Sequence, residues 1–138
     1  MSSVVVDSNV LLDAIVGEPA WADWSMYTLA DLARGSRLVI NPIIFAEVSI
    51  GFASIEDVEA ALGLAYLAHE PISLDAAFLA GKAYLAYRKR GGARRSPLPD
   101  FFIGAHAAVS GYRLLTRDAA RYRTYFPRVV LICPDAPI

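Results

Sequence analysis

The sequence has almost no cysteine and no long apolar run. Cys133 is the only cysteine, which excludes an internal disulfide framework and a cysteine-rich zinc site. The longest apolar run, residues 60–68, is about half of the ~18 residues that a membrane-spanning helix needs. The opening residues MSSVVVD lack the basic and apolar segments of a signal peptide. These absences predict a cytoplasmic protein that does not bind a membrane.

Basic residues are scarce in the first 81 positions, where only Arg34 and Arg37 occur. The rest lie between Lys82 and Arg128, a stretch that contains only two acidic residues. The net charge of −1 therefore hides a C-terminal part that is basic enough to bind a polyanion. An ordinary solvated surface explains the same arginines equally simply, so charge alone does not indicate nucleic-acid binding.

Short apolar runs typical of buried strands alternate with helical patterns along the chain. Strands are predicted at residues 3–7, 37–41, 71–74, 112–116 and 128–132. Helices are predicted at residues 8–17, 21–35, 41–52, 54–68, 75–92 and 99–111. This alternation predicts an α/β fold with a mostly parallel sheet and helices on both faces. No repeat or linker interrupts it, so a single domain over residues 1–138 is expected.

One acidic residue interrupts the otherwise apolar segment NPIIFAEVSIGF, residues 41–52. Asn41 and Pro42 suit the start of a helix, and a helix that is apolar all round is expected inside the protein. Glu47 would then be a buried carboxylate, which is costly unless it is paired or bound to a metal. No Lys or Arg occurs between Arg37 and Lys82, so Glu47 has no cation near it in sequence.

Three further acids fall near the ends of predicted strands. Asp7 ends the first strand, Asp100 opens a helix, and Asp118 follows the strand at 112–116. In an open parallel sheet the functional crevice lies beyond the carboxyl ends of the strands, so these acids and Glu47 are expected at one rim. Clustered carboxylates need a counter-charge, and their oxygens suit Mg²⁺ or Mn²⁺. Taken singly, Asp7, Asp100 and Asp118 are also explained as helix caps or first-turn acids.

Four segments, taken together, resemble the PIN-domain ribonucleases and most closely the VapC toxins of toxin–antitoxin modules. They are VVVDSNVLLDA at 4–14, the helix that carries Glu47, LPDFFIGAHA at 98–107 and LLTRDAARYRTYFP at 114–127. The resemblance covers essentially the whole chain. It implies a PIN-like three-layer α/β/α sandwich with a four- or five-stranded, mostly parallel central sheet.

The resemblance also implies an endoribonuclease that uses Mg²⁺ or Mn²⁺ and leaves a 5′-phosphate and a 3′-hydroxyl. Its catalytic and metal-binding acids would be Asp7, Glu47, Asp100 and Asp118, with Asp7 and Asp100 as the most direct metal ligands. Its supporting polar residues would be Ser8, Asn9 and Thr116. In such a site a metal lowers the pKa of a bound water and directs it at phosphorus.

Further expectations concern partners. The resemblance implies a VapB-type antitoxin and a homodimer, and the stripe Trp21, Trp24 and Tyr27 is a candidate for the antitoxin interface or for the core. Candidate RNA contacts, beside the acids in sequence, are Arg88, Lys89, Arg94, Arg95, Arg117 and Arg121. Tyr122, Phe126 and His106 are expected to pack in the core.

Two other functions remain open. In a receiver- or phosphatase-like protein, Asp7 would be the phosphoryl acceptor, but no Lys follows Asp118, where such proteins usually need one. In a non-catalytic module, the acid cluster would bind a structural metal or an arginine of a partner.

Overall fold

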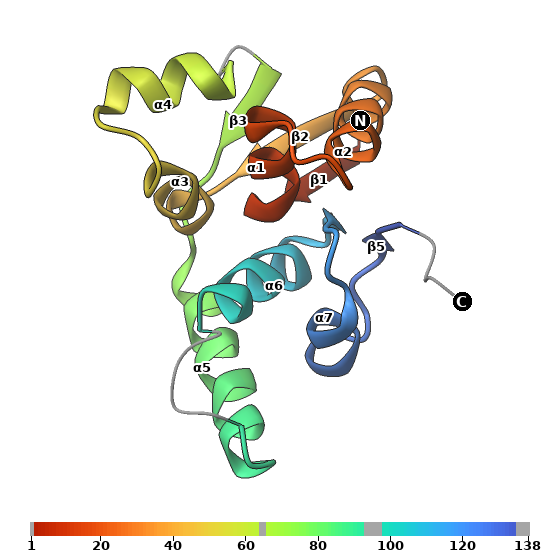
Figure 1. Ribbon diagram of the computed structural model, residues 1–138. Helices are drawn as coiled ribbons and strands as arrows, with labels where there is room; N and C mark the ends of the chain where they lie inside the picture. Colours follow the sequence, from red (N-terminus) through yellow and green to blue (C-terminus); the bar gives the residue numbers. More distant parts are fainter. Residues whose placement is uncertain (1, 64–65, 93–97, 135–138) are drawn as a thin grey trace.

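The computed structural model describes residues 2–63, 66–92 and 98–134 (Figure 1). The strands are β1 (Ser2–Val6), β2 (Ser36–Ile40), β3 (Leu67–His69), β4 (Arg113–Leu115) and β5 (Leu131–Ile132). The helices are α1 (Ser8–Val16), α2 (Ala22–Ala33), α3 (Pro42–Ser49), α4 (Ile55–Leu62), α5 (Leu74–Lys89), α6 (Leu98–Ser110) and α7 (Ala120–Tyr125).

The strands form one sheet in the order β3-β2-β1-β4-β5, and every neighbouring pair is parallel. The chain runs outward from β1 to β3 and then returns to the other side of β1 for β4 and β5. Right-handed crossovers in these two directions place the connecting helices on opposite faces of the sheet. The predicted three-layer α/β/α sandwich is therefore confirmed, with five strands that are parallel throughout.

The core lies around β1. Val4, Val5 and Val6 are fully buried, as expected for a central strand covered by helices on both faces. Phe101 and Ile103 of α6 are fully buried in the same apolar cluster. Because β1 is held in this way from both sides, the residue that follows it has a well-defined position.

Several helix ends are set locally, as the sequence predicted. Asn41 caps α3 by accepting a hydrogen bond from the N–H of Ile44 at 3.0 Å. Pro42 occupies the first turn of the same helix. Ser54 caps α4, and Gly17 ends α1 in the left-handed conformation with φ of 76°.

Two predicted elements are wrong in the middle of the chain. The helix expected at 54–68 ends at Leu62, because Gly63 turns the chain with φ of 57°. The third strand is not at 71–74: β3 pairs with β2 through Leu67 and Leu38, and Ser73 already caps α5. A short apolar run such as 67–69 cannot be told from the end of a helix by periodicity.

Two further differences concern helices. The sequence reading contained no helix after Asp118, where the structure has α7. The segment around Glu47 is not buried on all sides, because Ile50 is 85 % exposed. None of the helices in the described ranges is long and apolar enough to cross a membrane.

Candidate functional site

Asp7 lies where the strand order reverses, between the carboxyl ends of β1 and β4. Its N–H donates to the carbonyl of Leu115 at 2.9 Å, which ties the end of β1 to the end of β4. Its carboxylate is only 4 % exposed. It accepts three short hydrogen bonds, from the N–H of Ser8 at 2.8 Å, Thr116 Oγ1 at 2.8 Å and the Tyr122 hydroxyl at 2.9 Å.

The surroundings of Asp7 disfavour its charged form. Burial raises the pKa of this carboxyl from 3.8 to about 6. Hydrogen bonds from Thr116 and Tyr122 lower the pKa, while the nearby charges of Asp100 and Glu47 raise it further. Burial, followed by the charges of Asp7 and Asp100, holds the pKa of Tyr122 well above its ordinary value, so this hydroxyl stays protonated and donates. A divalent cation at Asp7 would relieve this destabilisation.

The side chain of Glu47, a residue of α3, reaches the surroundings of Asp7 at the end of β1. Ser8 Oγ donates to Glu47 Oε1 at 2.8 Å, so the side chain is held toward the end of β1. Burial raises the pKa of Glu47, the Ser8 hydrogen bond lowers it, and the charge of Asp100 raises it. No ion pair involves Glu47 in the part of the chain that the structure describes.

Asp100 stands in the first turn of α6, as the sequence predicted. Its Oδ2 accepts a hydrogen bond from Arg121 Nη1 at 2.5 Å, and the Arg121 guanidinium also lies 5.7 Å from the ring centre of Tyr87. Burial raises the pKa of Asp100, the ion pair with Arg121 lowers it, and Asp118 raises it. One of the six candidate RNA contacts, Arg121, therefore pairs with an acid of the same chain.

Asp118 occupies the exposed rim of this group. Its N–H donates to Thr116 Oγ1 at 3.1 Å, and its charge acts on Asp100. Asn9 Nδ2 lies 3.3 Å from Thr116 Oγ1 and 3.5 Å from Asp7 Oδ2. The structure thus brings together all four predicted acids and, around them, the three predicted supporting residues.

The donor set fits a hard divalent ion, because it consists of carboxylate oxygens that raise one another's pKa. Among the described residues, no group of three or more His, Cys, Asp or Glu side chains is close enough to form a ready-made metal site. Arg121 occupies one oxygen of Asp100 instead. The acids therefore suit Mg²⁺ or Mn²⁺ by their chemistry, and they must close in to bind it.

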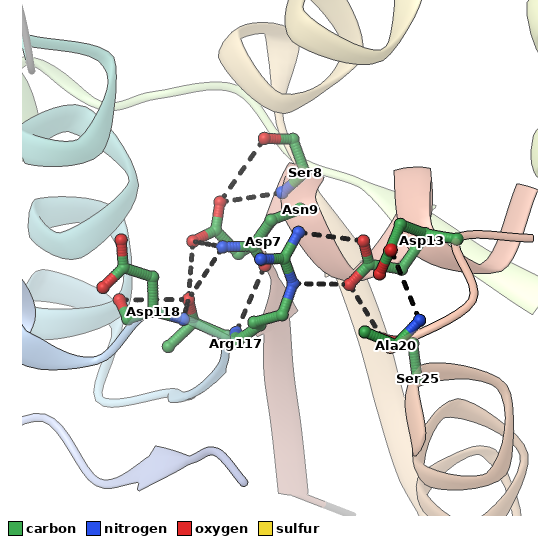
Figure 2. A network of polar contacts seen from close by, with 10 residues as sticks. Asp7, Ser8, Asn9, Asp13, Ala20, Ser25, Arg117 and Asp118 are labelled. Atoms are coloured by element: carbon green, nitrogen blue, oxygen red, sulfur yellow. Dashed lines mark hydrogen bonds and ion pairs between the residues drawn. The ribbon is translucent and has the colours of Figure 1, made fainter. Parts of the chain in front are cut away.

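Sequence reasoning missed two functional neighbours of the acids. Tyr122 is buried as predicted, but its hydroxyl also donates to Asp7. Asp13 is a second acid inside an apolar helix, only 3 % exposed and paired with Arg117 (Figure 2). Like Glu47, Asp13 is a carboxylate among apolar helix residues, and this sequence signal would have identified it.

The remaining basic candidates divide into three groups. Arg88 and Lys89 are exposed at the end of α5. Arg94 and Arg95 lie outside the described residues. Arg117 is committed to Asp13, at 2.7 and 2.9 Å.

Other predicted positions are now located. His106 is buried, as predicted, with Asn41 Nδ2 2.9 Å from Nδ1 and Glu70 Oε1 3.1 Å from Nε2. Trp21 and Trp24 form a half-buried, edge-to-face pair with ring centres 6.5 Å apart. The three aromatic residues of the stripe therefore differ in exposure: Tyr27 is 73 % exposed, while the two tryptophans are half-buried.

A parallel α/β sheet with a carboxylate cluster at its switch point is the arrangement that the described residues form. The model of the PIN domain family matches residues 4–127. The chain therefore belongs to the PIN domain family.

Solved structures share this fold along nearly their full length. VapBC2 from Rickettsia felis, bound to a DNA fragment from its promoter, matches with a TM-score of 0.75 and 22% identity, covering 96% of this chain and 99% of that chain. DNA-bound VapBC from Salmonella typhimurium matches with a TM-score of 0.72 and 17% identity, covering 96% and 98%. VapBC-1 from nontypeable Haemophilus influenzae matches with a TM-score of 0.71 and 17% identity, covering 95% and 97%. No curated protein sequence matches the chain.

Proposed function

We propose that this protein is a Mg²⁺- or Mn²⁺-dependent endoribonuclease that acts as the toxin of a VapBC-type toxin–antitoxin module. The observation that carries the proposal is the convergence of Asp7, Glu47 and Asp100, from three separate elements, on the switch point of a PIN domain. Burial and mutual repulsion raise the pKa of each of these carboxyls, and divalent-metal binding is the usual way to stabilise such a group.

In this proposal Asp7 and Asp100 hold the metal most directly, with Glu47 and Asp118 completing the acidic set. A bound Mg²⁺ or Mn²⁺ would acidify a water and neutralise developing charge on the phosphodiester. Thr116 holds the Asp7 carboxylate in one orientation, as does the Tyr122 hydroxyl. Ser8 does the same for Glu47, so hydrogen bonds from neighbouring residues hold both carboxylates toward the site.

RNA is the substrate that the basic part of the chain favours. Arg88 and Lys89 are exposed at the C-terminal end of α5 and available to phosphates, and Arg94 and Arg95 stay predictions of the same kind. Arg90 is exposed and lies 5.3 Å from the ring centre of Tyr125. Exposed cations beside aromatic rings suit a single-stranded RNA segment.

The partner in this proposal is a VapB-type antitoxin, since the similar folds include VapBC complexes. An apolar hollow of about 320 Å³ between α1, α2 and α4 offers a seat for an apolar antitoxin segment. Met26 and Tyr66 line it and are 54% and 51% exposed. A homodimer stays a prediction of the family resemblance, and a cytoplasmic location stays a prediction of the sequence composition.

The decisive experiment is cleavage of RNA by purified protein with Mn²⁺ and with EDTA. Asp7→Asn and Asp100→Asn should abolish cleavage, while Asp75→Asn, a change in an exposed first-turn acid, should cut like the wild type. Cleavage that survives EDTA, or an Asp7→Asn protein as active as the wild type, would contradict the proposal.

One observation favours the non-catalytic alternative: Asp100 is already paired with an arginine, Arg121. An acid cluster of that kind would bind an arginine of a partner without cutting RNA. Clean wild-type protein that binds an antitoxin but leaves RNA intact in Mn²⁺ would support it. The receiver-like alternative has no such support, because Asp7 is buried and already accepts three short hydrogen bonds.

A further inference from the structure

Arg117 lies between the acidic site and a second buried acid (Figure 2). Its Nε and Nη2 donate to the two oxygens of Asp13 at 2.7 and 2.9 Å, a bidentate pair. Asp13 is only 3 % exposed and also accepts from Ser25 Oγ at 3.3 Å. The guanidinium lies 5.4 Å from the ring centre of Trp21. The guanidinium is thus held by Asp13 and Trp21, and Asp13 is held in turn by Ser25.

The backbone of the same residue is fixed as well. The N–H of Arg117 donates to Asn9 Oδ1 at 3.2 Å. Both Asn9 and Asp13 belong to α1, the helix that Asp7 caps. The loop of residues 116–118, which joins β4 to α7, is therefore attached to α1 at two points by one residue.

This loop carries two groups of the acidic site. Thr116 is fully buried and donates to Asp7 Oδ2, and Thr116 Oγ1 accepts from the N–H of Asp118. If the Arg117 side chain were released, the loop would keep the Arg117 N–H bond to Asn9 and the Thr116 bond to Asp7, but it would lose its ion pair to α1 and with it the second attachment that limits its displacement from Asp7. Small displacements of this kind are costly for metal geometry and catalysis.

We propose that Arg117 is a positioning residue, which together with Asp13 locks the 116–118 loop in the geometry that metal binding requires, rather than a contact to RNA phosphate. A phosphate that took the guanidinium would leave Asp13 charged, buried and without its cation. This role rests on the metal binding of the proposed function, but it does not depend on RNA cleavage.

The test uses Arg117→Met and Asp13→Asn, singly and together, with Arg128→Met as the matched control on an exposed arginine. The first readout is Mn²⁺ affinity by calorimetry, which does not depend on activity. Each single variant should bind Mn²⁺ about tenfold more weakly, and the double variant no more weakly than the worse single one, since both changes break the same pair. The control should bind like the wild type.

The second readout is RNA. A positioning residue should lower kcat with KM within about twofold of the wild type, and leave the salt dependence of RNA binding unchanged. A phosphate contact predicts the opposite for Arg117→Met: a higher KM, a shallower salt dependence and normal Mn²⁺ affinity. Asp13→Asn separates the two roles most sharply. If Arg117 contacts phosphate, this change frees Arg117 for RNA and leaves RNA binding equal or tighter.

The results that would contradict the positioning role differ from those that would contradict the proposed function. Folded Arg117→Met and Asp13→Asn proteins with wild-type Mn²⁺ affinity would overturn the positioning role, whatever the RNA assay gives. Wild-type protein that binds Mn²⁺ without cutting RNA would overturn the nuclease, and weaker Mn²⁺ binding by the variants would still support positioning. If Asp13→Asn does not fold, Arg117→Lys decides: it keeps the charge but not the bidentate fork, so it should restore Mn²⁺ affinity only in part.

Discussion

Replacing Asp7 with asparagine should stabilise the protein in the absence of metal at neutral pH. The carboxylate is 4 % exposed and its pKa is raised to about 6, so its charged form costs folding free energy. An asparagine keeps the oxygen that caps α1 through the Ser8 N–H. Its amide faces Thr116 and Tyr122, whose hydroxyls can accept as well as donate.

The magnitude follows from the pKa. A rise from 3.8 to about 6 makes ionised Asp7 destabilising by about 3 kcal/mol at pH well above 6. Weaker hydrogen bonds to the neutral amide offset roughly 1 kcal/mol of this gain. The net stabilisation of about 2 kcal/mol corresponds to an increase in Tm of roughly 5–10 °C for a domain of this size.

The direction of the pKa shift fixes how the stability contribution of Asp7 changes with pH. Because the folded-state pKa of Asp7 lies above its ordinary value of 3.8, its favourable contribution is present below pH 3.8 and is lost as pH rises through 6. The advantage of Asp7→Asn should therefore be greatest at pH 8 and small at pH 4.

The assay is thermal unfolding of both proteins in EDTA from pH 4 to 8, repeated with Mn²⁺. Mn²⁺ should raise the Tm of the wild type at pH 8 and leave that of the variant nearly unchanged. An Asp7→Asn protein that is less stable than the wild type in EDTA at pH 8 would refute the reasoning, because Asp7 would then be a structural carboxylate that is stabilised by its donors.

The other predictions concern two further residues of the acidic site and one close contact in the core. Glu47→Gln should weaken Mn²⁺ binding by calorimetry while metal-free stability stays equal or rises, because burial and Asp100 disfavour the Glu47 charge; a clear loss of metal-free stability would contradict this. Arg121→Met should tighten Mn²⁺ binding several-fold, since it removes the cation that competes for Asp100; weaker binding would mean that Arg121 orients this ligand. Gly104→Ala should destabilise the fold by about 1–3 kcal/mol in chemical denaturation, because an added Cβ would overlap the ring of Phe126; wild-type stability would show that the ring can move aside.

Six of the seven helices of the described residues, all but α7, and the parallel nature of the sheet were readable from the sequence because they depend on local chemistry. The run before Asp7 is β-branched and fully apolar, as a central parallel strand requires, and the caps at Asn41 and Ser54 are contacts of three residues' separation. The third strand was predicted at the wrong residues, because β3 has only the three residues Leu67–His69 and so gives little sequence signal.

The candidate acids were also readable from the sequence, but mainly as a set: Glu47 stands out in its apolar helix, whereas Asp7, Asp100 and Asp118 drew attention because all three fall near one rim of the predicted sheet. The residues that hold these acids in place were not apparent from the sequence pattern alone. Thr116 could be assigned a supporting role only through the family resemblance, and Tyr122 looked like an ordinary core residue. The hydroxyls that hold Asp7 come from 109 and 115 residues away in the sequence.

Only the tertiary structure decides which group the Arg117 guanidinium binds. In the sequence it is one of many arginines near an acid, and it reads as a phosphate contact. In the fold it is paired with Asp13, 104 residues earlier. Periodicity and capping describe how a segment folds against its own neighbours, whereas the placement of β4 beside β1 determines which distant side chains meet. The sequence alone therefore indicated the acids, and the strand order decided what holds them in place.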